Sequence, residues 1–172
     1  RAPSIDGDDK AGVYYFRSLL DAEELLQRRK ENQNVYVIGS GPLGIETALA
    51  MKTHSNRVYL QVRSNLFTAD LDENAKIVLS DYIRSNGVEI IDNALVDEIV
   101  GNSKVSAVKM NNGNQLDVDV VIMCTGVSPL KELANKAGVD VNKGILVDDF
   151  MRTNNVDIYA IGEVAEHLGI TH

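Results

Sequence analysis

A glycine-rich turn between a strand and a helix constrains this 172-residue chain more than any other feature. Residues 35–38 form a short apolar run rich in β-branched side chains, which is typical of a strand buried on both faces of a sheet. The sequence GSGPLG follows at residues 39–44, and a helical pattern begins near Pro42. A second buried strand is expected at residues 58–62, which completes a βαβ unit.

A GxGxxG pattern in this context favours dinucleotide binding over a plain tight turn. We expect Gly39 to make the turn, Gly41 to let the backbone approach a pyrophosphate, and Gly44 to let the helix pack closely on the strand. The N-terminus of the helix would face the negative charge of the pyrophosphate. An S-adenosylmethionine-dependent methyltransferase also has a glycine-rich turn after its first strand, but that fold has no place for the meander predicted below.

The rest of the pattern predicts an α/β fold. An amphipathic helix is expected at residues 75–83 and a buried strand at 120–124. Short strands separated by turn signals predict a three-stranded antiparallel β-meander between residues 94 and 118. The prediction is a Rossmann-like parallel sheet with helices on one face and the meander on the other. A short helix and two strands, at 145–147 and 158–161, are expected to follow.

The end of the second strand bears on the choice of nucleotide. A unit that prefers NAD carries Asp or Glu there, about 20 residues after the glycines, to accept hydrogen bonds from the ribose 2′-hydroxyl. This strand instead ends in Val62-Arg63-Ser64. An arginine suits the 2′-phosphate of NADPH, since such a charge-assisted hydrogen bond contributes about 1.5–3 kcal/mol, and Ser64 would add a donor. The alternative is a solvated arginine at the start of a loop, so the sequence favours NADPH only slightly.

Charge and cysteine content argue against several other classes of function. The net charge of -8 disfavours nucleic acid and anionic membranes as partners, and no apolar run is long enough to span a membrane. The one cysteine, Cys124, follows a buried apolar run; it is expected to be an inert core thiol and fits a reducing compartment such as the cytoplasm. The histidines His54, His167 and His172 have no metal-ligand spacing. We therefore predict no metal site and no catalytic acid, base or nucleophile.

The chain resembles the pyridine-nucleotide-dependent flavoprotein disulfide-reductase superfamily in three motifs that occur in the family's order. These are GSGPLGIE at residues 39–46, VDVVIMCTG at 118–126 and TNNVDIYAIGEVAE at 153–166. The ending IGEVAEH is most similar to the branch of NADH oxidases, rubredoxin reductases and nitrite reductase large subunits. The family's first GxGxxG and its CxxxxC redox pair are absent from the chain.

The resemblance implies a division of the chain, because in this family the NAD(P)H domain is inserted into the FAD domain. Residues 1–33 correspond to a linker and lead-in helix, 34–126 to an NAD(P)H-binding Rossmann domain with its meander, and 127–172 to a short helix and the start of the returning FAD-domain segment. The chain, which begins without Met, is expected to be a piece of a larger flavoenzyme. It would bind NAD(P)H, with FAD in the full-length parent, and turn over nothing by itself. The alternative is a non-catalytic NAD(P)H-sensing module.

The resemblance also assigns roles to single residues. Glu46 matches the acid near the nicotinamide where it meets the flavin, or it is an exposed acid in the first turn of a helix. Arg63 matches the arginine of NADPH users, although the second arginine of that type, six positions later, is lacking. Gly126 matches a glycine beside the nicotinamide, and Gly162 with Glu163 matches the Gly-Asp pair that holds the ribityl chain of FAD. The candidate cofactor-binding residues are Gly39, Ser40, Gly41, Pro42, Leu43, Gly44, Glu46, Arg63, Ser64, Gly126, Gly162 and Glu163.

Overall fold

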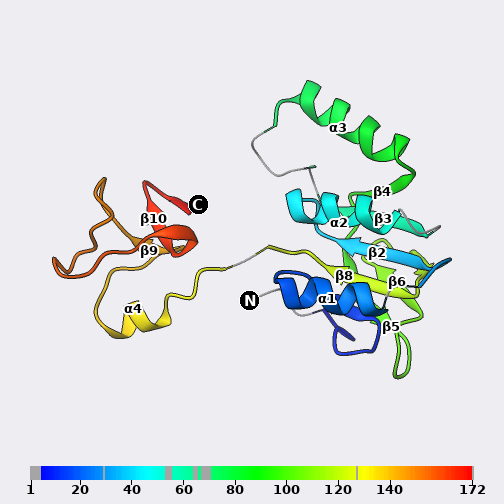
Figure 1. Cartoon of the computed structure of the whole chain (residues 1–172), viewed down its shortest axis with the longest axis horizontal. Coiled ribbons are helices and arrows are strands. Elements are labelled where there is room, and N and C mark those ends of the chain that lie inside the picture. The colour runs from blue at the N-terminus through cyan, green and yellow to red at the C-terminus, as the bar shows by residue number, and fades with distance from the viewer. Residues whose placement is uncertain are drawn as a thin grey trace. The chain divides into compact units, whose positions relative to one another are not determined.

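The computed structural model describes residues 5–28, 30–52, 56–63, 66, 71–126 and 128–171. The chain forms two compact units, of which the N-terminal one ends at Gly126. Figure 1 shows the elements of both units along the chain. Three residues discussed above, His54, Ser64 and His172, lie outside the described residues, as does Ala69, which stands six positions after Arg63 in place of a second arginine.

A five-stranded sheet is the centre of the N-terminal unit, and all four of its strand pairings are parallel. The order is β1-β8-β2-β3-β4, so β2 lies in the middle. The central strand pairs Ile38 with both Met123 of β8 and Gln61 of β3, so these three strands end at the same edge of the sheet. The strands are β1 (Val13–Tyr15), β2 (Asn34–Ile38), β3 (Arg57–Val62), β4 (Val88–Asp92) and β8 (Val120–Met123).

Alternating side chains of β2 divide the core into two layers, as the period of a strand requires. Val35 and Val37 pack with Ile45 of α2 and Ile83 of α3, on the face that the helices cover. Leu25 of α1 packs against the same cluster. These helices are α1 (Leu19–Arg28), α2 (Pro42–Lys52) and α3 (Glu73–Ser85) (Figure 1).

The opposite face of the sheet is covered by the predicted meander. Tyr36 and Ile38 of β2 pack there with Ile99 and Val108. The meander is antiparallel and consists of β5 (Val96–Val100), β6 (Ala107–Met110) and β7 (Gln115–Asp117). The predicted fold class, a parallel sheet between helices and a three-stranded meander, is confirmed.

Two local expectations were wrong. Residues 13–15, within the segment assigned to a linker and lead-in helix, form β1, which pairs in parallel with β8 at the edge of the sheet. Residues 158–161 form no strand, because only Tyr159 bridges to Arg152 there. The side chains of Tyr159 and Ile161 are exposed in this chain. The apolar pattern that suggested a strand therefore does not reflect burial within the C-terminal unit.

The C-terminal unit is small and carries one buried carboxylate. Its elements are α4 (Glu132–Lys136), β9 (Ile145–Leu146), the 3₁₀ turn η2 (Gly162–Val164), β10 (Ala165–His167) and β11 (Ile170–Thr171). Glu166 of β10 is 1% exposed and accepts hydrogen bonds from Asn142 Nδ2 at 2.9 Å and from the Gly144 amide at 2.8 Å. The pKa of Glu166 is lowered, chiefly by the hydrogen bond from the Gly144 amide. This carboxylate therefore joins the 142–144 turn to β10.

Candidate functional site

A cavity of about 560 Å³ opens at the edge where β2, β3 and β8 end. In open parallel sheets ligands bind at the carboxyl ends of the strands, where successive connections diverge to the two sides. Here β3 lies on one side of β2 and β8 on the other. The cavity brings together five of the residues predicted from the sequence: Gly39, Ser40, Gly41, Arg63 and Gly126.

The glycine turn has three different environments. Gly39 has φ +119°, and a Cβ on it would lie 2.3 Å from the carbonyl oxygen of Cys124 on the neighbouring strand. A Cβ on Gly44 would lie 1.9 Å from the Gly39 carbonyl oxygen, so α2 rests directly on the turn. A Cβ on Gly41 would meet nothing within 4 Å. The open space is therefore at the one glycine that should approach a pyrophosphate.

The N-terminus of α2 completes this cradle. Pro42 is the first residue of the helix, a position that suits its fixed φ and missing amide hydrogen. The first turn of α2 contains no acid, so no carboxylate of that turn neutralises the positive end of the helix dipole. Glu46 is exposed in the second turn, which corrects the alternative of a first-turn acid. Four of the predicted residues do not line the cavity, namely Pro42, Leu43, Gly44 and Glu46.

The end of β8 forms a second wall of the cavity. The Cys124 amide donates to the Ile38 carbonyl at 2.8 Å, which continues the pairing of β8 with β2. Gly126 has φ +81°, and its carbonyl accepts a hydrogen bond from Arg17 Nη2 at 3.3 Å. Between them, Thr125 Oγ1 is buried without a hydrogen-bond partner in the part of the chain that the structure describes. An unpaired buried hydroxyl is unusual and fits a site that a polar ligand completes.

The end of β3 forms the third wall. Arg63 is exposed and lines the cavity directly after the last residue of β3. Among the described residues that line the cavity there is no Asp or Glu. Gln61, also in the wall, is 5% exposed and accepts a hydrogen bond from the hydroxyl of Tyr36 at 3.4 Å. Sequence reasoning missed Gln61 and Thr125, although a glutamine inside an apolar strand was a visible signal.

Cys124 also borders the cavity, but its thiol is not poised to react. Burial raises the pKa of Cys124 to about 11, although a contact of Sγ with the Thr47 hydroxyl at 3.7 Å acts in the other direction. The thiolate is the reactive form, and it is scarce near neutral pH at such a pKa. No group of three His, Cys, Asp or Glu side chains that could hold a metal ion occurs in the described ranges.

The FAD-motif residues lie in the C-terminal unit. Gly162 has φ +75° and opens the η2 turn, and Glu163 is exposed within that turn. His167 follows in β10, with Nε2 2.8 Å from Asp149 Oδ1. The Glu163 carboxylate therefore lies on the surface of this unit.

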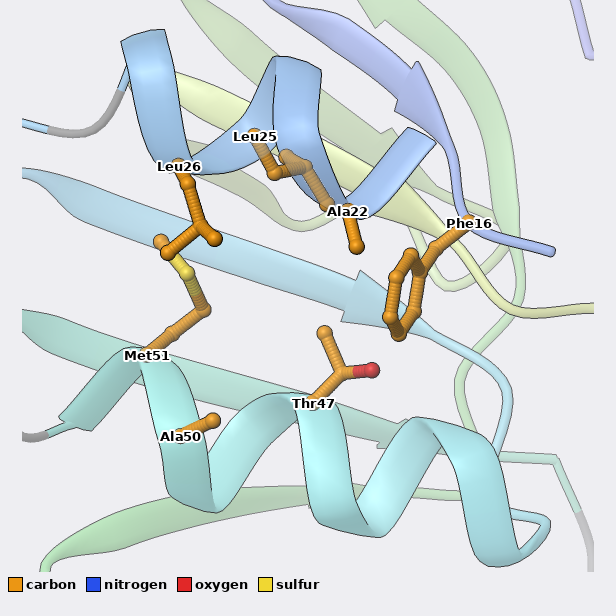
Figure 2. Close-up of a pocket in the computed structure, with 7 residues that line it drawn as sticks. All are labelled: Phe16, Ala22, Leu25, Leu26, Thr47, Ala50 and Met51. Atoms are coloured by element: carbon orange, nitrogen blue, oxygen red, sulfur yellow. The ribbon is translucent and has the colours of Figure 1, made fainter. Parts of the chain in front are cut away.

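A smaller cavity of about 190 Å³ lies between α1 and α2 (Figure 2). Phe16, Leu25, Leu26 and Met51 point into it, and its one polar side chain is Thr47. The Thr47 hydroxyl already donates to the Leu43 carbonyl at 2.6 Å. This apolar groove has no group that could bind a phosphate or act in catalysis.

Over the described part of the chain, no helix is long and apolar enough to cross a membrane.

The comparison with known proteins decides the family. The family model of the pyridine nucleotide-disulphide oxidoreductases matches residues 1–172. The chain belongs to this family. The resemblance stated from the three motifs is therefore confirmed.

Relatives of known name agree with the predicted enzyme class. The assimilatory nitrate reductase electron transfer subunit of Bacillus subtilis is 35% identical over 98% of this chain, which spans 22% of that relative. Other relatives are named nitrite reductase [NAD(P)H], NADH oxidase and rubredoxin-NAD(+) reductase. These relatives are NAD(P)H-dependent oxidoreductases, and the chain spans between 21% and 43% of their length.

Solved structures agree with the fold. A ferredoxin reductase from Rhodopseudomonas palustris superposes with a TM-score of 0.92 at 27% identity, covering 97% of this chain and 42% of that protein. An engineered variant of the water-forming oxidase from Lactobacillus brevis, bound to NADPH, has a TM-score of 0.85 at 29% identity, covering 96% and 37%. The architecture is therefore that of these oxidoreductases over nearly the whole chain.

Proposed function

We propose that the N-terminal unit binds NAD(P)H and positions its nicotinamide for hydride transfer to the flavin of an FAD-dependent oxidoreductase. The observation that carries this proposal is the open space at Gly41, beside the N-terminus of α2 and inside the cavity at the edge where β2, β3 and β8 end. When bound, the nucleotide supplies a hydride and the flavin accepts it, so the chemistry belongs to the cofactors. The chain contributes binding and orientation.

Each wall of the cavity has its own task in this proposal. The amides at the start of α2 bind the pyrophosphate, because they point at the ligand and the helix dipole favours negative charge. Gly39 and Gly44 keep the turn, the strand and the helix close enough to form the cradle. Gly126 and Thr125 flank the nicotinamide half, where Arg17 holds the turn by its bond to the Gly126 carbonyl. Glu46 on α2 is assigned to the nicotinamide end by the family motif alone.

Arg63 supports a preference for NADPH. Its side chain is exposed at the rim of the cavity, and no described acid in the lining would repel a 2′-phosphate there. The engineered NADPH-bound oxidase replaces three consecutive residues, Asp-Ala-Met, by Ala-Arg-Ser. The order of an aliphatic residue, arginine and serine also occurs here at Val62, Arg63 and Ser64. We assign Ser64 to the same phosphate from this pattern.

Gly162 and Glu163 would contact FAD in the full-length parent. The Glu163 carboxylate is exposed and can accept hydrogen bonds from hydroxyl groups such as those of a ribityl chain. The remaining FAD-binding residues would come from outside this chain, so we propose that the 172-residue chain binds nucleotide without turnover. The single free cysteine supports the expected reducing, cytoplasmic location.

A binding titration with two variants tests the proposal. Gly41→Val would place a side chain in the cradle at a position where a Cβ meets nothing within 4 Å, so NADH and NADPH affinity should fall at least tenfold while the fold is retained. Ala50→Val places the same side chain at an exposed position of α2 and should bind as wild type. Nucleotide fluorescence measures both. Unchanged affinity in Gly41→Val, with wild type binding, would refute the assignment of the cradle.

A further inference from the structure

A buried polar pair crosses the floor of the nucleotide cavity. Tyr36 of β2 is fully buried and Gln61 of β3 is 5% exposed, within a layer whose other members are almost all apolar. The Tyr36 hydroxyl lies 3.4 Å from Gln61 Oε1. Gln61 also lines the cavity. The residue therefore borders the open space while its Oε1 contacts Tyr36.

The hydrogen bonds of this pair leave one group unused. Burial raises the pKa of Tyr36 above its ordinary value, so the hydroxyl keeps its proton. That proton has one acceptor in the described part of the chain, Gln61 Oε1. The amide is thereby oriented with Nε2 away from Tyr36, and Nε2 carries two donor hydrogens.

No hydrogen bond from Gln61 Nε2 is found in the described ranges, and it is not among their fully enclosed, unpartnered side-chain atoms. Since Gln61 lines the cavity, Nε2 can donate to a group placed there. A ligand oxygen at this place would accept a hydrogen bond from Nε2 in a mostly apolar wall, and such a bond contributes to affinity.

The position on β3 indicates which ligand oxygen this is. Gln61 and Arg63 are two residues apart, so their side chains leave the same face of the strand, about 6–7 Å apart along it. Gln61 lies deeper and Arg63 lies at the rim. In a Rossmann unit the adenosine ribose lies at the end of this strand.

We propose that Gln61 Nε2 donates a hydrogen bond to the oxygen at the 2′ position of the adenosine ribose, and that Tyr36 is a positioning residue that fixes the amide for this bond. The inference rests on the proposed function. Both NADH and NADPH carry an oxygen at this position, and the amide is neutral. Gln61 therefore contributes to the affinity of both nucleotides, whereas Arg63 distinguishes between them.

The test compares Gln61→Met, which keeps the length of the side chain, with Gln115→Met at an exposed position of β7 as the matched control. Nucleotide fluorescence gives the affinity of the 172-residue chain for NADH, NADPH and NADH whose adenosine lacks the 2′-hydroxyl. Gln61→Met should weaken NADH and NADPH alike, by about fivefold to tenfold. It should not weaken the 2′-deoxy nucleotide, because the bond is already absent there. Tyr36→Phe should give a smaller loss with the same pattern.

The outcomes separate the two proposals. If wild type binds neither nucleotide, the proposed function fails and this inference falls with it. If wild type binds and Gln61→Met equals wild type, or loses the same factor for the 2′-deoxy nucleotide, only the role of Gln61 is overturned. Should Gln61→Met not fold, the side-chain Nε2 resonance of Gln61 in wild type answers the question. It should shift with 2′-AMP and stay unchanged with nicotinamide mononucleotide, and an unmoved resonance with 2′-AMP overturns the inference.

Discussion

Gly44 rests on Gly39 so closely that a Cβ at Gly44 would lie 1.9 Å from the Gly39 carbonyl oxygen. The contact is between backbone and backbone, so no flexible side chain can give way. Gly44→Ala should push α2 away from the turn and lower the free energy of unfolding by about 2 kcal/mol, within the range of overpacked sites. Urea unfolding followed by far-ultraviolet circular dichroism measures this change.

The same turn offers the control. A Cβ on Gly41 would meet nothing within 4 Å, and Gly41 has no positive φ. The free energy of unfolding of Gly41→Ala should therefore stay within about 0.5 kcal/mol of the wild-type value. An equal loss of stability in the two variants would show that the spacing between α2 and the turn is not what Gly44 provides.

Arg63 should select for the 2′-phosphate. Arg63→Met is expected to weaken NADPH by about tenfold to a hundredfold, since one charge-assisted bond to phosphate is lost, and to change NADH far less. Isothermal titration with both nucleotides gives the ratio. Arg57→Met, an exposed arginine at the opposite end of the same strand, is the control and should change neither affinity. Equal losses for NADH and NADPH would contradict a contact with the 2′-phosphate.

Cys124 should make the protein less stable in mildly alkaline solution. Burial holds its pKa near 11 in the folded protein, against an ordinary value of 9.0. Between these values the folded state keeps a proton that the unfolded state has lost, so stability falls as pH rises above 9. From pH 8 to pH 10 the loss should be about 1 kcal/mol. Urea unfolding of wild type and Cys124→Ala measures it, and the same pH slope in both would rule out the thiol as its source.

Glu166 should stabilise the C-terminal unit in its charged form. Its pKa is lowered chiefly by the Gly144 amide, so the stabilisation is present above the ordinary value of 4.5 and is lost as pH falls below it. Glu166→Gln removes one acceptor oxygen and should speed hydrogen exchange at the Gly144 amide. Exchange at Gly101, in the other unit, should not change. Unaltered exchange at Gly144 would show that the carboxylate does not hold the 142–144 turn.

The three-layer fold was predictable because each of its main elements has a sequence pattern that extends over many residues. The βαβ unit, the amphipathic α3 and the turn signals of the meander each span enough residues to identify an element. Strand β1 has three residues, and only its pairing with β8 makes it a strand. The apolar residues near Ile161 misled in the other direction, since they are exposed in this chain.

The candidate site was predictable only where backbone chemistry demands a residue type. The close approaches at Gly39 and Gly44 require glycine, so the motif marks them. Gln61 stands out through its hydrogen bond with Tyr36 of the neighbouring strand, and Thr125 through its buried hydroxyl without a partner among the described residues. Local spacing in the sequence indicates neither. Ser64 remains a prediction, because it lies outside the described residues.

Nitrogen–proton correlation spectra of the 172-residue chain, recorded while NADH or NADPH is added, test the central claim most directly. The account predicts that the amides of Gly41 and Gly44 shift progressively with either nucleotide. The amides of Gly101 and Gly113, in the turns of the meander, should stay in place. No shift at Gly41 or Gly44 with millimolar amounts of either nucleotide would contradict the assignment of this cavity to NAD(P)H.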